Sequence, residues 1–261
     1  MSNQKPLVGI LGGMGPQAGL DMAGKIIAMT RAECDQDHIP FILFSLPATV
    51  PDRTSFLLGK TDINPAYGIA AQFESMSALG ITVAAMACNT AYADPIFNVV
   101  LELLRNKRIS LRILHMVRET VAHIVDAYPK IERVGVLATH GTYQTRLYDQ
   151  ALEAAGLEAV LPTTSVREND IYPALYGPNG IKACSGVITG QTRRRVGSAI
   201  RHLHDLGAEA VILACTELPM AVGKDRVDGT TIVDPARIIA AKLIREVCPD
   251  KLIYRDCRAA L

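Results

Sequence analysis

The sequence predicts an α/β protein of two similar lobes, each a parallel sheet flanked by helices, and three observations lead to that prediction. Short runs rich in Val, Ile and Leu alternate with longer segments of helical spacing, as in β–α units around a parallel sheet. The chain has 261 residues, which exceeds a typical single domain and suits two modest lobes. Two pairs of segments also repeat at a nearly constant separation, which indicates a duplication.

The first β–α unit is expected to open with a strand over residues 7–11 and a turn over residues 12–16. A helix is expected over residues 17–33, because Pro16 is favourable at the first helical position. The later strands are expected at residues 42–46, 83–87, 113–116, 134–137, 159–161 and 210–214. Helices fill the intervals, and Gly156 is expected to end the helix that begins near Thr142.

The internal repeat consists of two matches. Residues 8–12 with Gly15 resemble residues 134–138 with Gly141, which lie 126 residues later. Residues 79–88 resemble residues 206–215, which lie 127 residues later, and each segment begins with Leu-Gly and ends with Ala-Cys. Chance could produce either match alone, but two matches at nearly one separation indicate the duplication of one β–α lobe.

The predicted domains are residues 1–116 and 117–226, with the boundary near residues 114–118. Nothing at this boundary has the composition of a flexible linker, so we expect the lobes to pack closely. A C-terminal helix is expected over about residues 227–261 and is expected to return to the first lobe. Its apolar positions Ile239, Leu243 and Val247 follow the i, i+4, i+8 spacing of one helical face.

Composition excludes several classes of function. The net charge is +1 without basic runs, so neither nucleic acid nor an anionic membrane is an expected partner. The longest apolar stretches are strand-sized, and the N-terminus is short and polar, so a cytoplasmic protein is expected. The six cysteines form no C-x-x-C pair, and His202 and His204 lie on different faces of a predicted helix. Reduced thiols and no metal site are therefore expected.

Two cysteines, Cys88 and Cys215, occupy equivalent places at the ends of predicted strands. Ligands of open parallel sheets bind beyond the carboxyl ends of the strands. If an approximate two-fold axis relates the lobes, a ligand in the interdomain cleft is flanked by both thiols. This arrangement suits removal of a proton from one face of a carbon and its replacement on the other. A helix N-terminus lowers a thiol pKa from its usual value of about 8.5, which favours a thiolate.

Neighbouring residues supply donors for a carboxylate. The Cys-Asn-Thr run at 88–90 and the Cys-Thr-Glu run at 215–217 offer amide, hydroxyl and backbone N–H groups that could stabilise charge on that carboxylate. The turn that contains Met14 lacks the G-x-G-x-x-G order of a dinucleotide site, and Pro16 removes an N–H donor. A tight loop that holds a small carboxylate suits this turn better.

Five motifs carry a resemblance that spans nearly the whole chain in the expected order. The runs GILGGMGP (9–16), PDRT (51–54), ACNTA (87–91), ATHGT (138–142) and ACTELP (214–219) together resemble the aspartate/glutamate racemase family. The resemblance implies two pseudo-symmetric, Rossmann-like α/β domains, a homodimer, and catalysis without pyridoxal phosphate or metal. Its implied partner is a small amino-acid substrate.

The resemblance also implies roles for individual residues. Arg53 and Lys182 would bind the carboxylates of the substrate, and Asp52 and Glu217 would orient or tune the thiols. The remaining substrate-binding candidates are Met14, Asn89, Thr90, Thr139, Thr142 and Thr216. Each assignment has an alternative: Arg53 as a solvated turn residue, Lys182 as a surface lysine, and the two acids as helix caps. Cys34, Cys184, Cys248 and Cys257 are interpreted as incidental thiols.

The main hypothesis is a cofactor-independent racemase of aspartate, glutamate or a similar amino acid, with Cys88 and Cys215 as the two acid–base groups. Hydantoin racemases, maleate isomerases and arylmalonate decarboxylases of the same superfamily are alternatives. A hydantoin racemase or a decarboxylase would have less need for both Arg53 and Lys182, and a maleate isomerase would use a cysteine as nucleophile. A bilobal binding protein is a further alternative, because fold does not fix function.

Overall fold

The computed structural model describes residues 7–183, 187–223 and 225–253, so Cys184 and Cys257 lie outside the described residues. The chain forms two compact units, Met1–Glu119 with Ala236–Leu261, and Thr120–Pro235. Each unit contains its own largely parallel sheet with helices around it, which confirms the predicted α/β class. Within the described part of the chain, no helix combines the length and apolar composition needed to cross a bilayer.

The first unit contains a four-stranded parallel sheet of order β2-β1-β3-β4. The strands are β1 (Val8–Leu11), β2 (Phe41–Phe44), β3 (Val83–Met86) and β4 (Arg112–Ile113). All residues of β1 and β3 are buried, and both strands are runs of apolar residues and glycine. Such runs form the centre of a parallel sheet because helices cover both of its faces.

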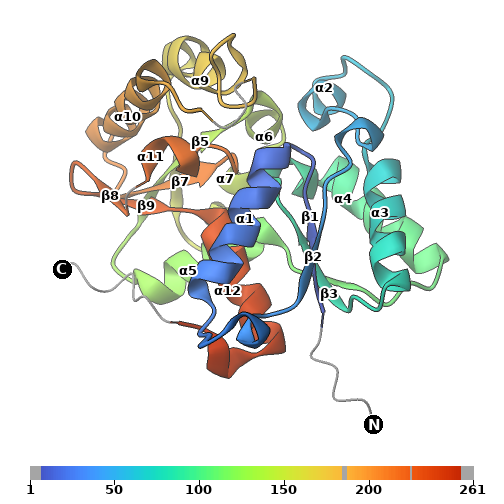
Figure 1. Cartoon of the computed structure of the whole chain (residues 1–261). Helices are drawn as coiled ribbons and strands as arrows, with labels where there is room; N and C mark the ends of the chain where they lie inside the picture. The colour runs from blue at the N-terminus through green and yellow to red at the C-terminus, as the bar shows by residue number, and fades with distance from the viewer. Residues whose placement is uncertain (1–6, 184–186, 224, 254–261) are drawn as a thin grey trace. The chain divides into compact units, whose positions relative to one another are not determined.

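Helices of the first unit lie on both sides of this sheet. Figure 1 shows α1 and α12 on one side of β1, β2 and β3, and α3 and α4 on the other. The helices are α1 (Pro16–Met29), α2 (Arg53–Leu57), α3 (Ala66–Ala78), α4 (Asp94–Asn106), α12 (Pro235–Val247) and α5 (Met116–Ala127), which continues into the second unit. Short 3₁₀ turns are η1 (Asp35–Asp37), η2 (Pro47–Thr49), η3 (Asn89–Tyr92) and η5 (Pro249–Lys251).

The second unit contains a five-stranded sheet of order β6-β5-β7-β9-β8, in which only β8 is antiparallel to its neighbour. The strands are β5 (Arg133–Ala138), β6 (Glu158–Val160), β7 (Ala210–Ala214), β8 (Arg226–Val227) and β9 (Thr230–Val233). The helices are α6 (His140–Gln144), α7 (Leu147–Ala154), α8 (Thr164–Val166), the π-helix η4 (Arg167–Ile171), α9 (Tyr172–Tyr176), α10 (Gly190–Asp205) and α11 (Pro219–Val222).

The prediction of one helix over residues 227–261 is wrong at its start. Residues 226–233 form the β8–β9 hairpin, and the helix α12 covers only Pro235–Val247. The two hairpin-turn residues, Asp228 and Gly229, both have positive φ (47° and 85°), as a type I′ turn requires. An Asp-Gly pair between short β-branched runs is the signal that would have revealed this hairpin. Residues 254–261 lie outside the described residues.

The helix expected between Thr142 and Gly156 is divided into α6 and α7. Arg146 separates them in the left-handed conformation, with φ of 50°. The predicted stop is confirmed, because α7 ends at Ala154 and Gly156 follows with φ of 78°.

Strand registers support the duplication that the sequence indicates. In the first unit Val8 pairs with Val83 and Leu11 with Met86. In the second unit the equivalent residues lie 126 positions later for β1 and 127 positions later for β3. They make the same pairs, Val134 with Ala210 and Leu137 with Leu213. The order β2-β1-β3-β4 also recurs as β6-β5-β7-β9. The two sequence matches therefore lie on neighbouring strands in one common register.

A glycine in β1 and a glycine in β5 let a helix approach each sheet closely. A Cβ atom added at Gly9 or at Gly135 would lie within 2.9–3.2 Å of three neighbouring side chains. The neighbours are Met76, Ile81 and Ala84 for Gly9, and Leu203, Ala208 and Val211 for Gly135. Each neighbour in the second set lies 127 residues after its counterpart in the first. The same helix–sheet packing therefore occurs in both units.

Replacing Gly135 by alanine is expected to lower the free energy of unfolding by roughly 1–3 kcal/mol, the usual effect of overpacking a core. The control is Gly24→Ala on α1, where nothing lies within 4 Å of the added Cβ. This control should raise stability by up to about 1 kcal/mol, because alanine favours a helix. Urea unfolding of both variants measures the difference, and equal midpoints would contradict the close packing.

Candidate active site

In the first unit, Cys88 lies two residues beyond the end of β3. Its side chain is 6 % exposed, and the buried residues Asn89 and Thr90 follow it in η3. The Ala87 N–H donates to the Leu11 carbonyl at 2.8 Å, so the β1–β3 hydrogen bonding continues up to the cysteine. The thiol therefore stands at the carboxyl end of a central strand, as the sequence predicts.

Tyr92 holds the backbone around Cys88. Its hydroxyl accepts from the Met86 N–H and donates to the Leu114 carbonyl, both at 2.8 Å. Burial raises the pKa of Tyr92 far above its usual value, so the hydroxyl stays protonated and can keep donating. Sequence analysis did not single out this tyrosine, although a phenol four residues after a strand-end cysteine in a buried run is a recognisable signal.

Arg53 links two loops of the first unit. Its Nη2 donates to the Met14 carbonyl at 2.6 Å and its Nη1 to the Pro51 carbonyl at 3.2 Å. The helix α2, which begins with Arg53, lies against η3, which carries Asn89 and Thr90. Several predicted site residues of the first unit thus gather at the carboxyl ends of its strands. Arg53 is half-buried rather than a solvated turn residue.

Asp52 is the exposed N-cap of α2, and its Oδ1 accepts from the Ser55 N–H at 2.6 Å. This is the capping role that the sequence offered as an alternative. Tuning of a thiol by Asp52 stays a prediction.

In the second unit, Cys215 directly follows β7 and is 5 % exposed. Its Sγ–H donates to Glu217 Oε2 at 3.1 Å, and the Thr216 hydroxyl donates to the same oxygen at 3.4 Å. The other oxygen of Glu217 accepts from Lys182 Nζ in an ion pair. The structure therefore joins the half-buried Lys182 and the buried Glu217 and Cys215 in one network.

This network excludes the simpler alternatives for two of its members. Lys182 is not an ordinary surface lysine, since its side chain is 21 % exposed and paired. Glu217 is 2 % exposed, and no side chain caps α11.

The electrostatics of this network favour a neutral thiol. Burial raises the pKa of Cys215 well above its usual value, the Glu217 carboxylate raises it further, and Lys182 opposes both effects. The expectation that a helix N-terminus lowers this pKa is wrong for Cys215, because burial and the Glu217 carboxylate raise the pKa. The helix that follows, α11, begins only at Pro219 and is four residues long. Burial would lower the pKa of Lys182, but the Glu217 carboxylate raises it and the net shift is upward, so the ammonium stays charged.

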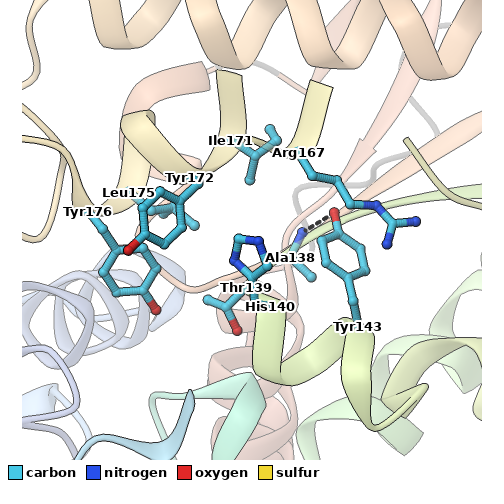
Figure 2. Close-up of a pocket in the computed structure, with 9 residues that line it drawn as sticks. All are labelled: Ala138, Thr139, His140, Tyr143, Arg167, Ile171, Tyr172, Leu175 and Tyr176. Carbon is cyan, nitrogen blue, oxygen red and sulfur yellow. Dashed lines mark hydrogen bonds between the residues drawn. The ribbon is translucent and has the colours of Figure 1, made fainter. Parts of the chain in front are cut away.

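Thr139 and Thr142 are buried at the start of α6, with their hydroxyl oxygens 3.2 Å apart. Thr139 also belongs to a small pocket lined by Ala138, Thr139, His140, Tyr143, Arg167, Ile171, Tyr172, Leu175 and Tyr176. Figure 2 shows the rings of His140, Tyr172 and Tyr176 gathered beside Thr139. This pocket lies at the carboxyl end of β5.

Tyr143 holds the end of β5 much as Tyr92 holds the end of β3. Its hydroxyl accepts from the Ala138 N–H at 2.9 Å, the dashed bond in Figure 2, and donates to the Val136 carbonyl at 3.1 Å. The Arg167 guanidinium lies 4.3 Å from the centre of the Tyr143 ring. In each unit, a tyrosine hydroxyl therefore fixes a strand end that carries candidate site residues.

Residues 11–243 match the family model described as Asp/Glu/hydantoin racemase. The chain belongs to this family. Among residues 7–183, 187–223 and 225–253, no three His, Cys, Asp or Glu side chains form a group that could hold a metal ion.

Individual relatives agree with the family. The broad-specificity amino-acid racemase RacX of Bacillus subtilis is 25 % identical over 217 residues, which cover 81 % of this chain and 86 % of that protein. The structure resembles aspartate racemase from Picrophilus torridus with a TM-score of 0.76 and 26 % identity, covering 93 % and 94 % of the two chains. An aspartate racemase homologue from Pyrococcus horikoshii shares the fold, with a TM-score of 0.68, 22 % identity and coverage of 94 % and 99 %. The family match and the B. subtilis and P. torridus relatives support an isomerase of the racemase type.

Proposed function

We propose that the protein interconverts the L and D forms of aspartate, glutamate or a similar amino acid by proton transfer between the α-carbon and two cysteines. The observation that carries this proposal is the equivalent burial of Cys88 and Cys215 at the ends of equivalent strands in the two copies of one duplicated lobe. The racemase names of the B. subtilis and P. torridus relatives support an amino-acid substrate.

The proton transfer is proposed to run from one thiol position to the other. The Cys88 thiolate takes the α-proton, and the electron pair of the broken C–H bond delocalises onto the α-carboxylate. The Cys215 thiol then gives its proton to the opposite face of the carbon and becomes a thiolate. The hydrogen bond from Cys215 to Glu217 supports this direction, because a donating Sγ carries its proton before the reaction. The reverse reaction exchanges the two roles.

The carboxylate contacts are proposed to come from one cation in each unit. Arg53 suits the α-carboxylate, because a guanidinium can bind it in bidentate fashion and acidify the α-proton. Lys182 is proposed to share its charge between Glu217 and a second carboxylate of the substrate. The donors around them are proposed to be Met14, Asn89, Thr90, Thr139, Thr142 and Thr216, with Asp52 as a tuning residue. The racemase family resemblance supports extending the proposal to a cytoplasmic homodimer.

The test is incubation of the purified protein with L-aspartate or L-glutamate in deuterium oxide, followed by chiral chromatography with mass detection. Appearance of the D form with deuterium at the α-carbon is expected without added cofactor. Parallel reactions with a chelator and with hydroxylamine, which captures pyridoxal phosphate, should proceed at the same rate. Folded, reduced protein that forms no D product and exchanges no proton from either acid would overturn the proposal for these substrates.

A further inference from the structure

The segment that leads to Arg53 has few apolar contacts of its own. Residues 45–49 are exposed and include η2, and Val50 is the first buried side chain after them. Asp52 and Arg53 follow within three residues of Val50. Because loops without buried side chains move readily, the position of this segment has to be set by the surface beneath it.

Gly68 on α3 provides that surface. A Cβ atom added at Gly68 would lie 2.0 Å from the Thr49 carbonyl oxygen, 3.0 Å from its carbon and 3.4 Å from Val50 Cγ2. The backbone of the loop therefore rests directly on the helix, in space that any other side chain would fill. Gly24 on α1 is a contrasting helical glycine, since an added Cβ there meets nothing within 4 Å.

Gln72 lies one helical turn after Gly68 and fixes the same part of the loop. Its Nε2 donates to Thr49 Oγ1 at 3.0 Å, and the Thr49 hydroxyl donates in turn to the Leu46 carbonyl at 2.8 Å. Because the single hydroxyl hydrogen of Thr49 is used on Leu46, only a donor at residue 72 completes this arrangement. Gln72 is 4 % exposed, and among the described residues its buried Oε1 has no hydrogen-bond partner. Burying an amide oxygen without a hydrogen-bond partner lowers stability, so Gln72 occupies this position at a cost to stability.

Both ends of the 46–53 loop contact the glycine-rich turn after β1. Arg53 donates to the Met14 carbonyl, and a Cβ atom added at Gly13 would lie 3.0 Å from the Leu46 nitrogen. A displacement of Thr49 would therefore be transmitted through Leu46 and Arg53 to the turn.

We propose that Gly68 and Gln72 are positioning residues, which hold the 46–53 loop so that the Arg53 guanidinium meets the substrate carboxylate. The carboxylate-binding role of Arg53 in this inference rests on the proposed function. The contacts of Gly68 and Gln72 with Thr49 do not depend on it. A displaced guanidinium loses bidentate geometry, so both its hold on the carboxylate and its acidifying effect on the α-proton should weaken.

The variants Gly68→Ala and Gln72→Met test this inference, with Gly24→Ala as the matched control. The first experiment is hydrogen exchange with mass spectrometry on peptides that cover residues 46–58. Both test variants should exchange faster there, and the control should match the wild type. Gln72→Met removes the donor without adding bulk to the helix–loop contact, so it serves even if Gly68→Ala does not fold.

The second experiment measures kcat and KM for the amino acid that the wild type racemises. KM is expected to rise about tenfold and kcat to fall by a smaller factor, because Arg53 contributes both to binding and to the acidity of the α-proton. Faster amide hydrogen exchange in the loop without a rise in KM would show that the loop contact does not position Arg53. Unchanged amide exchange in Gln72→Met would show that Gln72 does not hold the loop. If the wild type racemises no amino acid in a broad panel, the proposed function fails, whereas the exchange experiment still decides whether α3 positions the loop.

Discussion

Replacing Cys88 or Cys215 by serine is expected to lower the rate of racemisation by roughly 10²–10⁴-fold, the range that a general acid or base contributes. A serine hydroxyl is a far weaker acid than a thiol, so it neither gives nor takes the α-proton at neutral pH. Substrate binding should remain measurable by calorimetry, because the serine keeps the shape of the side chain. Chiral chromatography of timed reactions measures the loss.

The single-cysteine variants also separate the two faces of the substrate. Each variant keeps one thiol, which can remove the α-proton of one enantiomer and exchange it with solvent without inversion. Cys88→Ser and Cys215→Ser should therefore incorporate deuterium into opposite enantiomers. Exchange of the same enantiomer by both variants would contradict the assignment of the two thiols to opposite faces.

Two other cysteines provide matched controls. Cys34 is exposed and Cys248 is half-buried, and neither thiol lies at the end of a strand. Serine at either position should leave kcat and KM unchanged. A binding protein without catalysis would behave differently, since it would bind its ligand in all four variants and in the wild type without turnover.

Much of the fold was predictable because it repeats a local pattern. The central strands β1, β3, β5 and β7 are short apolar runs bounded by glycine, cysteine or threonine, so their positions were predicted to within one or two residues. The hairpin of Arg226–Val227 and Thr230–Val233 was missed because its strands are too short to show a period. The break at Arg146 was missed because no glycine or proline marks it, although its φ of 50° interrupts the helix.

The candidate site divides in the same way between local and long-range features. The strand-end places of Cys88 and Cys215, and the capping of α2 by Asp52, follow from neighbouring residues and were predictable. The ion pair of Lys182 with Glu217 joins residues 35 positions apart, and no sequence pattern indicates that Glu217 is the partner of Lys182. The network then reversed the pKa shift expected for Cys215, since burial and a neighbouring carboxylate act only once the chain has folded.

Replacing Glu217 by glutamine is expected to lower the pKa of Cys215. Burial and the Glu217 carboxylate raise this pKa, so the thiol keeps its proton through neutral pH and releases it only at higher pH. Without the carboxylate, the proton should leave at lower pH. For the enantiomer whose α-proton Cys215 removes, the racemisation rate should therefore rise at lower pH than in the wild type. The pH profile of kcat/KM for each enantiomer measures this shift.

Lys182→Met should shift the same pH-dependent rise in rate to higher pH, because the ammonium lowers the pKa of Cys215 and its loss raises that pKa. The exposed pair of Glu158 with Arg133 provides the control, and Glu158→Gln should leave both profiles unchanged. A shift of both Glu217→Gln and Lys182→Met to the same side would mean that the variants act through distorted packing rather than through charge.

Stability provides a separate test of the same pair. Each single substitution leaves one buried charge without its partner, and breaking a buried ion pair destabilises a protein by about 3–5 kcal/mol. The double variant Glu217→Gln/Lys182→Met removes both charges, so its loss of unfolding free energy should be smaller than the sum of the two single losses. If the losses are additive, the pair contributes no coupling energy, and the ion pair between Lys182 and Glu217 does not stabilise the fold.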